Sequence, residues 1–500
     1  MKLPYVFILP ILIFLFGCAD INDKSSNRPN IIFFFVDDMG WQETSVPFYS
    51  EKTSLNDRYF TPNMEKLAMK GMKFTQAYAC AVCSPSRISL MTGMNAARHM
   101  VTNWTLRKDQ SPDQPNDTIE SPKWNVNGLS AKEGQSRAVY SETLPQKLKR
   151  VGYRTIHVGK AHFGARQTSG EDPKNLGFDV NIAGHAAGGP GSYLGKYNYS
   201  AIWRAPKQDI WDVPGLDKYH GTDTFLTEAL TIEASKAIKD AVEREKPFYL
   251  YMSHYAIHAP WEKDDRFYQK YVDRGLDEFD ATYASMIEGM DQSLGDIMEM
   301  VDELGVMENT IFVFMSDNGS PSQADQNLPL RGHKLTPYEG GVRVPMIVKW
   351  SGVTQENSTN NQYLIIEDIF PTFLEMAGID FEKSDETDGV SFVPLLKGEG
   401  DYPKNRPIFW HYPNTYNQPP YSAIRQGKWK LIYHHTNRKL ELFNLEEDIS
   451  ERNNFAFQNR EKTHELSRAL TDHLLSSGAL MPWDKIKQET VPYPIEVIKL

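Results

Sequence analysis

The stretch Ile31-Ile32-Phe33-Phe34-Phe35-Val36-Asp37-Asp38 decides the fold class of this chain of 500 residues. Six apolar residues in succession, without polar alternation, are typical of a strand that is buried on both faces of a parallel sheet. Two carboxylates follow at once, where such a strand ends. Because ligands of open α/β sheets bind beyond the carboxyl ends of the strands, Asp37 and Asp38 are candidate site residues.

Further apolar runs predict strands that alternate with helices along the chain. The predicted strands cover residues 31–36, 153–158, 248–253 and 310–316. The predicted helices cover residues 61–70, 144–151, 225–242 and 280–304. This alternation predicts an α/β fold with a large mixed, mostly parallel sheet sandwiched by helices. Asp317 and Asn318 follow a strand end in the same way as Asp37 and Asp38 do.

The predicted secondary-structure pattern of the chain changes after about residue 403. Short strand-like runs and one helical pattern predict a smaller antiparallel sheet with one helix, at residues 407–410, 422–425, 429–433, 440–443 and 461–475. We therefore expect a catalytic α/β domain over 29–400 and a C-terminal subdomain over 401–500. The long irregular stretches 102–136 and 183–218 are rich in Gly, Pro, Asn, Trp and Tyr, which is typical of lids and binding loops.

The N-terminus predicts export. Met1-Lys2 precedes an apolar run that ends at Gly17, which is short for a membrane span and typical of a signal peptide over 1–17. Leu15-Phe16-Gly17-Cys18 resembles a bacterial lipobox, so Cys18 is expected to carry lipid and residues 18–28 to form a tether. The alternative is a plain secretory signal with an incidental cysteine. The prediction is an exported bacterial lipoprotein, facing the periplasm or exposed on the outer membrane, that contacts the membrane through its lipid only.

The net charge of −11 makes nucleic acid a poor partner. An acidic protein that acts on an acidic substrate needs a locally basic pocket.

The run Cys83-Ser84-Pro85-Ser86-Arg87-Ile88-Ser89-Leu90-Met91-Thr92-Gly93 carries the main functional signal. It resembles the signature C-x-P-S-R-x-x-x-[LM]-T-G of the type I, formylglycine-dependent sulfatases, an arylsulfatase-like family of the alkaline phosphatase superfamily. The match holds at every fixed position. In that family a formylglycine-generating maturation enzyme oxidises the cysteine to formylglycine (3-oxoalanine), and the hydrated aldehyde is the nucleophile. The resemblance implies that Cys83 is modified in this way.

Two other readings of Cys83 stay open. It can be a small buried apolar residue, or half of a redox dithiol with Cys80. A zinc ribbon needs a second ligand pair, and the only other cysteine is Cys18.

Four oxygen-bearing side chains suggest a hard-cation site, because three carboxylates and an amide suit Ca²⁺ or Mg²⁺ better than zinc: Asp37, Asp38, Asp317 and Asn318. Either pair alone predicts a cation site only weakly, because neighbouring acidic residues often do no more than keep a loop in contact with water. The resemblance implies Ca²⁺, with Mg²⁺ second, held by these residues together with the residue made from Cys83. Arg87 lies one helical turn after Cys83 and, by resemblance, holds the aldehyde hydrate and the metal-side geometry.

The remaining candidate residues follow from the same resemblance. Gly159-Lys160-Ala161-His162-Phe163-Gly164 is similar to the family's G-K-x-H-x-G, which assigns Lys160 to the sulfate and His162 to the hydrate. His258-Ala259-Pro260 is similar to H-x-P, which makes His258 a sulfate contact and the general acid for the leaving alcohol. Lys334 is assigned to the sulfate. A structural role is expected for His254 and for a Glu339–Arg343 pair, and none is assigned to His333.

These residues predict a sulfatase that hydrolyses sulfate esters. An exported protein indicates an external polymer, so a sulfated polysaccharide or its oligosaccharides is the expected substrate. Aromatic side chains in two stretches are candidates to stack on sugar rings, or alternatively to pack between domains: Tyr193, Tyr197, Tyr199, Trp203, Trp211, Tyr219 and His220, and then Trp410, His411, Tyr412, Tyr416 and Tyr421. The rival functions are a phosphodiesterase or phosphonate monoester hydrolase of the same superfamily and a non-catalytic glycan-binding lipoprotein.

Overall fold

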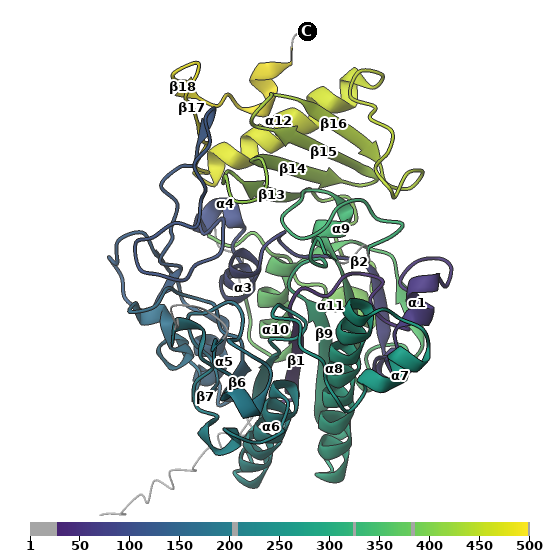
Figure 1. Cartoon of the computed structure of the whole chain (residues 1–500). Coiled ribbons are helices and arrows are strands. Elements are labelled where there is room, and N and C mark those ends of the chain that lie inside the picture. The colour runs from purple at the N-terminus through teal and green to yellow at the C-terminus, as the bar shows by residue number, and fades with distance from the viewer. Residues whose placement is uncertain (1–27, 203–208, 324–326, 382–385, 499–500) are drawn as a thin grey trace, which may run out of the picture.

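The computed structural model describes residues 28–202, 209–323, 327–381 and 386–498. A nine-stranded sheet forms the centre of the main domain (Figure 1). Its strands, in spatial order, are β11(Ser358–Asn360), β2(Met72–Tyr78), β10(Arg343–Lys349), β9(Thr310–Ser316), β1(Asn30–Val36), β8(Phe248–Ser253), β6(Arg154–Gly159) and β7(Val180–Ile182), and β12(Leu364–Ile365) pairs with β2. Neighbouring strands are parallel except at β10, which is antiparallel to both β9 and β2.

β1 lies in the middle of this sheet and shows why an unbroken apolar run was needed there. It pairs in parallel with β8 on one side and with β9 on the other. Successive side chains of a strand point to opposite faces. Ile31, Phe33 and Phe35 therefore enter one hydrophobic core, while the alternate residues from Ile32 to Val36 enter the other. The predicted strands at 153–158, 248–253 and 310–316 are confirmed as β6, β8 and β9.

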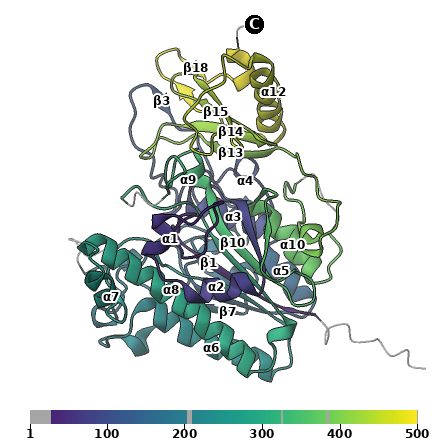
Figure 2. The same cartoon turned by 90° about the vertical axis from the view of Figure 1, so that its right-hand side faces the viewer.

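Helices cover both faces of the sheet (Figure 2). One face carries α2(Pro62–Met69), α6(Leu226–Glu243) and α8(Glu278–Glu303). The other face carries α3(Cys83–Thr92), α5(Leu144–Arg150), α10(Ile369–Met376) and α11(Val393–Lys397). The sandwich predicted from the sequence is confirmed, and α2, α5, α6 and α8 match the predicted helices within two residues at each end.

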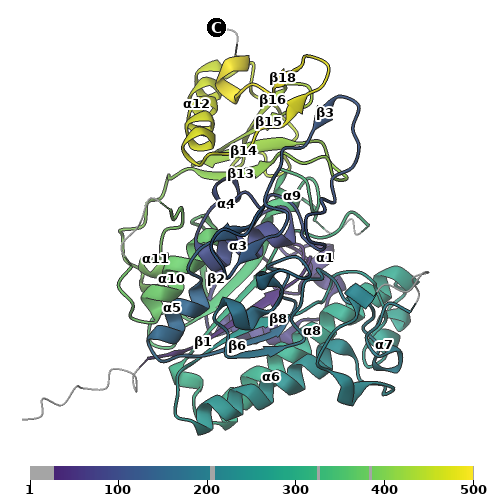
Figure 3. The same ribbon diagram turned by 90° about the vertical axis from the view of Figure 1, so that its left-hand side faces the viewer.

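The C-terminal subdomain is a four-stranded antiparallel sheet with one long helix, as predicted (Figure 3). Its elements are β13(Ile408–Tyr412), β14(Tyr421–Gln426), β15(Trp429–His434), β16(Leu440–Asn444) and α12(Arg460–Ser476). One face of the sheet packs on α12 through residues such as Leu431 and Leu470. The opposite face, which includes Ala423 and Ile432, joins the core of the main domain. The small sheet is thus packed between its own helix and the main domain.

Shorter elements complete the chain. They are α1(Ser54–Arg58), α4(Ala96–His99), β3(Ile119–Glu120), β4(Leu129–Ser130), β5(Val139–Tyr140), α7(Tyr268–Asp273), α9(Glu339–Val342), β17(Trp483–Asp484) and β18(Glu489–Thr490). β17 pairs with β3 as well as with β18, so the long stretch 102–136 is anchored to the end of the chain.

The predicted signal peptide, Cys18 and Trp203 lie outside the described residues. Arg28, the first described residue, donates hydrogen bonds to the carbonyl oxygens of Ala377 and Val151 at 3.0 and 3.3 Å. The chain is therefore already attached to the main domain at the end of the predicted tether. Within the described ranges, every helix is too short or too polar to cross a lipid bilayer.

A buried ion-pair cluster fixes the C-terminal subdomain to the main domain. The Lys430 ammonium on β15 lies 2.9 Å from a carboxylate oxygen of Glu339 in α9 and 3.0 Å from one of Glu451. All three side chains are buried. Removing one partner of such a cluster leaves an uncompensated buried charge.

Lys430→Met is expected to lower the free energy of unfolding by about 3–5 kcal/mol, because it removes the buried cation that Glu339 and Glu451 share, although Arg343 still pairs with Glu339. Urea unfolding followed by fluorescence measures the change. Lys428→Met is the matched control in the same hairpin, because the Lys428 ammonium is half-exposed and lies 4.0 Å from Glu447. Equal stability of the two variants would contradict this account of the cluster.

Candidate active site

The ends of β1 and β9 bring together the four residues predicted to hold a cation. Val36 lies opposite Ser316 in the parallel pair, so Asp37-Asp38 and Asp317-Asn318 leave the sheet side by side. The Asp38 amide donates to an Asp317 carboxylate oxygen at 3.2 Å. The Asn318 side-chain amide donates to Asp38 Oδ1 at 2.8 Å. All four residues are buried.

Cys83 is the first residue of α3 and completes this group. Its sulfur and one carboxylate oxygen each of Asp37 and Asp317 lie within 4.8 Å of one another. The start of a helix carries unpaired backbone N–H groups and a partial positive charge, which favour an anion at this position.

Arg87 lies one turn further along α3 and is completely buried. Its Nε and Nη2 donate to Asp317 Oδ2 at 3.1 and 2.8 Å. Its Nη1 donates to Ser253 Oγ at 2.6 Å and to the carbonyl of Lys160 at 3.1 Å. Arg87 thus links the ends of three strands and fixes the Asp317 carboxylate, which supports its predicted role on the metal side.

Lys160 and His162 follow β6 but point to different partners. The Lys160 ammonium lies 2.6 Å from Asp37 Oδ2, and its side chain is fully buried. His162 Nε2 donates to the carbonyl of Thr105 at 2.7 Å, and Nδ1 has no hydrogen-bond partner in the part of the chain that the structure describes. In this structure His162 lines the pocket, whereas Lys160 is not among the lining residues and pairs with Asp37.

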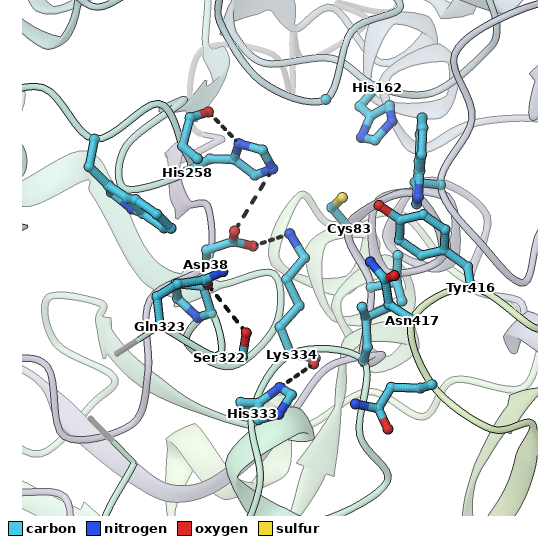
Figure 4. A pocket seen from close by; sticks show the side chains of 18 of the residues that line it. Asp38, Cys83, His162, His258, Ser322, Gln323, His333, Lys334, Tyr416 and Asn417 are labelled. Atoms are coloured by element: carbon cyan, nitrogen blue, oxygen red, sulfur yellow. Dashed lines mark hydrogen bonds and ion pairs between the residues drawn. The ribbon is translucent and has the colours of Figure 1, made fainter. Parts of the chain in front are cut away.

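His258 and Lys334 come from loops after β8 and β9 and line the same pocket (Figure 4). Lys334 pairs with Asp38 Oδ1. His258 Nδ1 donates to the carbonyl of Ala259 at 2.7 Å, and its Nε2 lies 3.9 Å from Asp38 Oδ2. Figure 4 shows Cys83 with His162 on one side and Lys334 and Asp38 on the other.

The backbone is strained at two of these residues. Asp38 and His162 have φ angles of 62° and 55°. Such left-handed conformations are uncommon for residues other than glycine and cost about 1–3 kcal/mol each. They persist here because both side chains are held by hydrogen bonds or ion pairs.

Burial and neighbouring charges shift the pKa values of the three carboxyl groups in different directions. Burial, together with the charge of Asp317, raises the pKa of Asp37 well above its usual range. Burial alone would also raise the pKa values of Asp38 and Asp317, but cations outweigh it and hold both below the usual range. For Asp38 the main cation is Lys334, and for Asp317 it is Arg87.

The donor set fits a hard divalent cation. Asp37 Oδ1 and Asn318 Oδ1 are buried and accept no hydrogen bond from a described residue. Unpaired buried oxygens are costly, and carboxylate and amide oxygens are the ligands that Ca²⁺ and Mg²⁺ prefer. Lys160 and Lys334 contact two of these carboxylates and supply positive charge at the same place.

The pocket above Cys83 has a volume of about 800 Å³ and aromatic walls. Among the described residues, four aromatic side chains line it: Trp104, Trp211, Trp261 and Tyr416. The sequence had indicated Trp211 and Tyr416 but not Trp104 or Trp261, although Trp104 lies within the predicted binding loop 102–136. His333, to which the sequence assigns no role, also lines the pocket.

Most of the other aromatic candidates are wrong as pocket residues, because they are buried in the folded core. Trp410 donates to the carbonyl of Ala79 at 2.9 Å and joins the main core, so the alternative of packing between domains holds for it. Buried as well are Tyr193, Tyr199, His411, Tyr412 and Tyr421. Tyr197, Tyr219 and His220 are less buried but do not line the pocket.

Two glycines that the sequence did not indicate let the backbone pack directly against the rings of His162 and His258. A Cβ atom on Gly188 would lie 2.3 Å from His162 Cε1, and one on Gly189 would lie 2.7 Å from His258 Nδ1. Only glycine lets this backbone approach both rings so closely.

The structural roles expected for other residues are confirmed. His254 is buried and its Nε2 lies 2.9 Å from Ser293 Oγ. Arg343 pairs with Glu339 at 3.3 Å where β10 begins.

Comparisons with known proteins agree with this site. A family model described as Sulfatase matches residues 29–379, and one described as N-sulphoglucosamine sulphohydrolase, C-terminal, matches residues 333–478. A protein of Formosa agariphila named Sulfatase is 28% identical over 96% of this chain and 95% of its own. Human N-acetylgalactosamine-6-sulfatase is 31% identical over 77% of this chain and 69% of its own.

Among solved structures, Ps i-CgsB in complex with k-i-k-neocarrahexaose is similar, with a TM-score of 0.73 and 26% identity over 90% of this chain and 93% of its own. The α/β fold, the site at the strand ends and the matches along most of the sequence lead to one conclusion. The chain belongs to the type I sulfatase family of the alkaline phosphatase superfamily and is a sulfuric ester hydrolase.

Proposed function

We propose that this protein removes sulfate from a sulfated polysaccharide or its oligosaccharides, with a formylglycine made from Cys83 as the nucleophile. One observation carries the proposal: Cys83 lies in a single pocket with His162, His258 and Lys334, directly above the carboxylates at the strand ends. A formylglycine-generating maturation enzyme is the partner that this requires.

The state of the Cys83 thiol supports its modification. Burial raises the pKa of this thiol, and the nearby Lys160 and Lys334 only partly oppose the effect. A protonated thiol is a poor nucleophile. The hydrate of an aldehyde at the same position offers one hydroxyl to attack the sulfur atom and a second one whose deprotonation later expels sulfate and restores the aldehyde.

His162 suits the role of the base in that second step. Burial, with the charges of Lys160 and Arg87, holds its pKa well below the usual range, so the ring is neutral. Because Nε2 donates to Thr105, the unpaired Nδ1 is the atom that accepts a proton.

His258 suits the role of the acid for the departing alcohol. Its Nδ1 is occupied by the Ala259 carbonyl, so Nε2 is the atom that carries the transferred proton. Burial lowers the pKa of His258 to about 4, against the opposing charge of Asp38. A bound anionic ester raises that pKa again, because a nearby negative charge favours the imidazolium.

The cations of the site stabilise the charge on the sulfate oxygens. Lys334 lines the pocket, and we assign it to direct contact with the sulfate. The direct sulfate contact of Lys160 stays a prediction, and in this structure its ammonium orients Asp37. Arg87 likewise fixes Asp317.

We propose Ca²⁺ as the resident cation, with Mg²⁺ second. Asp37, Asp38, Asp317 and Asn318 would hold it, together with the residue made from Cys83. When bound, the cation offsets negative charge on the transferred group. The irregular set of carboxylate and amide oxygens suits the flexible coordination of Ca²⁺ better than the strict octahedron of Mg²⁺.

Removal of the cation by a chelator is expected to lower kcat by roughly 100-fold or more, because charge stabilisation at the reacting group is lost. Added Ca²⁺ restores the rate of the wild type but not that of Asp317→Asn, which keeps the size of the side chain and loses its charge. Asp265→Asn, at an exposed carboxylate paired with Lys263, is the control. An unchanged rate after chelation, with no metal left by elemental analysis, would refute the cation site.

The proposal of a glycan substrate rests on what the relatives are named for and on the aromatic side chains that line the pocket. Ps i-CgsB has been solved with k-i-k-neocarrahexaose, and mammalian relatives are named N-acetylgalactosamine-6-sulfatase. Trp104, Trp211, Trp261 and Tyr416 offer aromatic faces at the pocket, on which sugar rings can stack.

Sulfate release from a panel of sulfated glycans and their oligosaccharides tests the function. The protein is co-expressed with a formylglycine-generating enzyme, and matched phosphate esters are included. We expect release from at least one glycan class, no comparable phosphate release, and a loss of at least about 10³-fold in Cys83→Ala, since the nucleophile is absent. Equal turnover of phosphate esters, or full activity of Cys83→Ala, would overturn the proposal.

We propose that the chain works as an exported lipoprotein, in the periplasm or on the outer membrane, because the lipobox-like segment ends at Cys18. Membrane fractionation of cells is expected to find the wild type in the membrane and Cys18→Ser in the soluble fraction. Identical fractionation of the two chains would exclude a lipid on Cys18.

A further inference from the structure

Tyr193 is completely buried beside the His258 backbone, although the sequence indicated it as a residue that stacks on sugars. Its hydroxyl oxygen lies 2.6 Å from the carbonyl oxygen of Tyr255 and 2.8 Å from that of His258. Burial, together with the charges of Asp37 and Asp38, raises the pKa of Tyr193 well above its usual range. The hydroxyl therefore keeps its proton and is a donor to these backbone carbonyls.

Three polar groups of His258 are hydrogen-bonded within the fold. Its amide donates to the carbonyl of Tyr255 at 2.9 Å, and its own carbonyl accepts from the Tyr193 hydroxyl. Its ring Nδ1 donates to the carbonyl of Ala259 at 2.7 Å. The other ring nitrogen, Nε2, lies 3.9 Å from Asp38 Oδ2 at the pocket (Figure 4). Because the backbone of His258 is held at both of its polar groups, the direction of Nε2 depends on the Tyr193 hydroxyl.

Tyr193 is itself anchored to the long helix α6. Its carbonyl accepts from the amide of Leu226, the first residue of that helix, at 2.7 Å. Its ring stacks on Phe225, with the ring centroids 5.4 Å apart and the planes 18° apart. Both neighbours belong to the core that joins α6 to one face of the large sheet. The hydroxyl of Tyr193 therefore has a fixed position relative to the sheet.

Glu262 makes a second connection between the two segments. It follows His258 by four residues, and its Oε2 accepts from the Tyr193 amide at 2.6 Å and from Ser192 Oγ at 2.8 Å. The preceding Gly189 packs against the His258 ring, since a Cβ atom there would lie 2.7 Å from Nδ1. The loop that carries His258 is thus fixed to the segment that ends at Tyr193 through both backbone and ring.

The direction of Nε2 decides whether a proton reaches the departing alcohol. In the proposed first step an oxygen of the aldehyde hydrate bonds to sulfur, the bond from sulfur to the alcohol oxygen breaks, and its electron pair stays on that oxygen. The proton on Nε2 of the His258 imidazolium moves to the same oxygen and leaves a neutral ring. A shift of about 1 Å in such a group costs up to roughly 100-fold in rate.

We propose that Tyr193 is a positioning residue for this reaction: its hydroxyl, acting through the carbonyl of His258, keeps Nε2 aimed at the leaving alcohol. Glu262 supports Tyr193 in this role. The inference rests on the proposed function, in which His258 is the acid, and deepens it. Tyr193 is not among the described residues that line the pocket, so it acts through His258 and not on the substrate.

A structural comparison tests the positioning without any substrate. Tyr193→Phe removes the hydroxyl and keeps the ring. Tyr433→Phe is the matched control, because the hydroxyl of the buried Tyr433 also donates to a carbonyl, that of Pro492 at 2.8 Å, in the C-terminal subdomain. We expect crystal structures of the full chain to show the His258 ring displaced or in several conformers in Tyr193→Phe and unchanged in Tyr433→Phe. Urea unfolding shows that both variants are folded.

A double-mutant cycle tests whether Tyr193 acts through His258. Formation of the desulfated sugar is measured in a single turnover and scaled to the fraction of chains with an aldehyde at Cys83. We expect Tyr193→Phe to lower this rate roughly tenfold in the wild-type background and by less than about twofold in a His258→Ala background, because the ring it positions is then absent. Tyr433→Phe is expected to have the same small effect in both backgrounds.

An unmoved His258 ring in Tyr193→Phe, or a loss of roughly tenfold in both backgrounds, would overturn the inference, because Tyr193 would then not act through His258. A displaced ring without any change in rate would instead contradict the role of His258 as the acid, and would confirm that Tyr193 positions the ring. If Tyr193→Phe does not fold, Glu262→Ala takes its place with the same expected pattern, since it removes the acceptor of the Tyr193 amide.

Discussion

The buried ion pairs of Arg87 and Lys160 with Asp317 and Asp37 are the constraint on which the rest of this structure depends. Their charges come from α3, from the loop after β6, and from the ends of β9 and β1. Charges removed from water are tolerated only when they are paired and hydrogen-bonded, so none of these segments can move alone. The same pairs that hold the sheet together at its carboxyl end therefore position the groups around Cys83.

This arrangement also explains the chemistry of the site. Asp37, Asp38 and Asp317 bring like charges together, and Arg87, Lys160 and Lys334 balance them. The charges of such a site are already in place to stabilise the charge that develops in the transition state. This preorganised electrostatic stabilisation is usually the largest single contribution to catalysis. The surrounding loops, rather than the sheet, supply the aromatic walls of the pocket. The side chains that we propose to contact the glycan are thus separate from those at the strand ends.

Local sequence was enough to predict the central strands and the residues that follow them. The run from Ile31 to Val36 is short, rich in β-branched and aromatic residues and typical of a strand buried on both faces, and the end of that strand places Asp37 and Asp38. β10 and β2 were not predicted, and the reversed direction of β10 is set by pairing partners distant in sequence. From the sequence alone, Trp410 can be either a residue that stacks on a sugar or a core residue. Only the hydrogen bond from its indole to the carbonyl of Ala79, seen in the structure, decides between the two. The close approach of Gly188 to His162 likewise depends on tertiary structure.

The central claim is that Cys83 acts only after conversion to an aldehyde. The most direct measurement prepares the protein with different amounts of maturation enzyme, determines by mass spectrometry the fraction of chains with an aldehyde at Cys83, and measures sulfate release by each sample. The account predicts a rate proportional to that fraction and no release at zero. Substantial release from chains that carry only the thiol would contradict it.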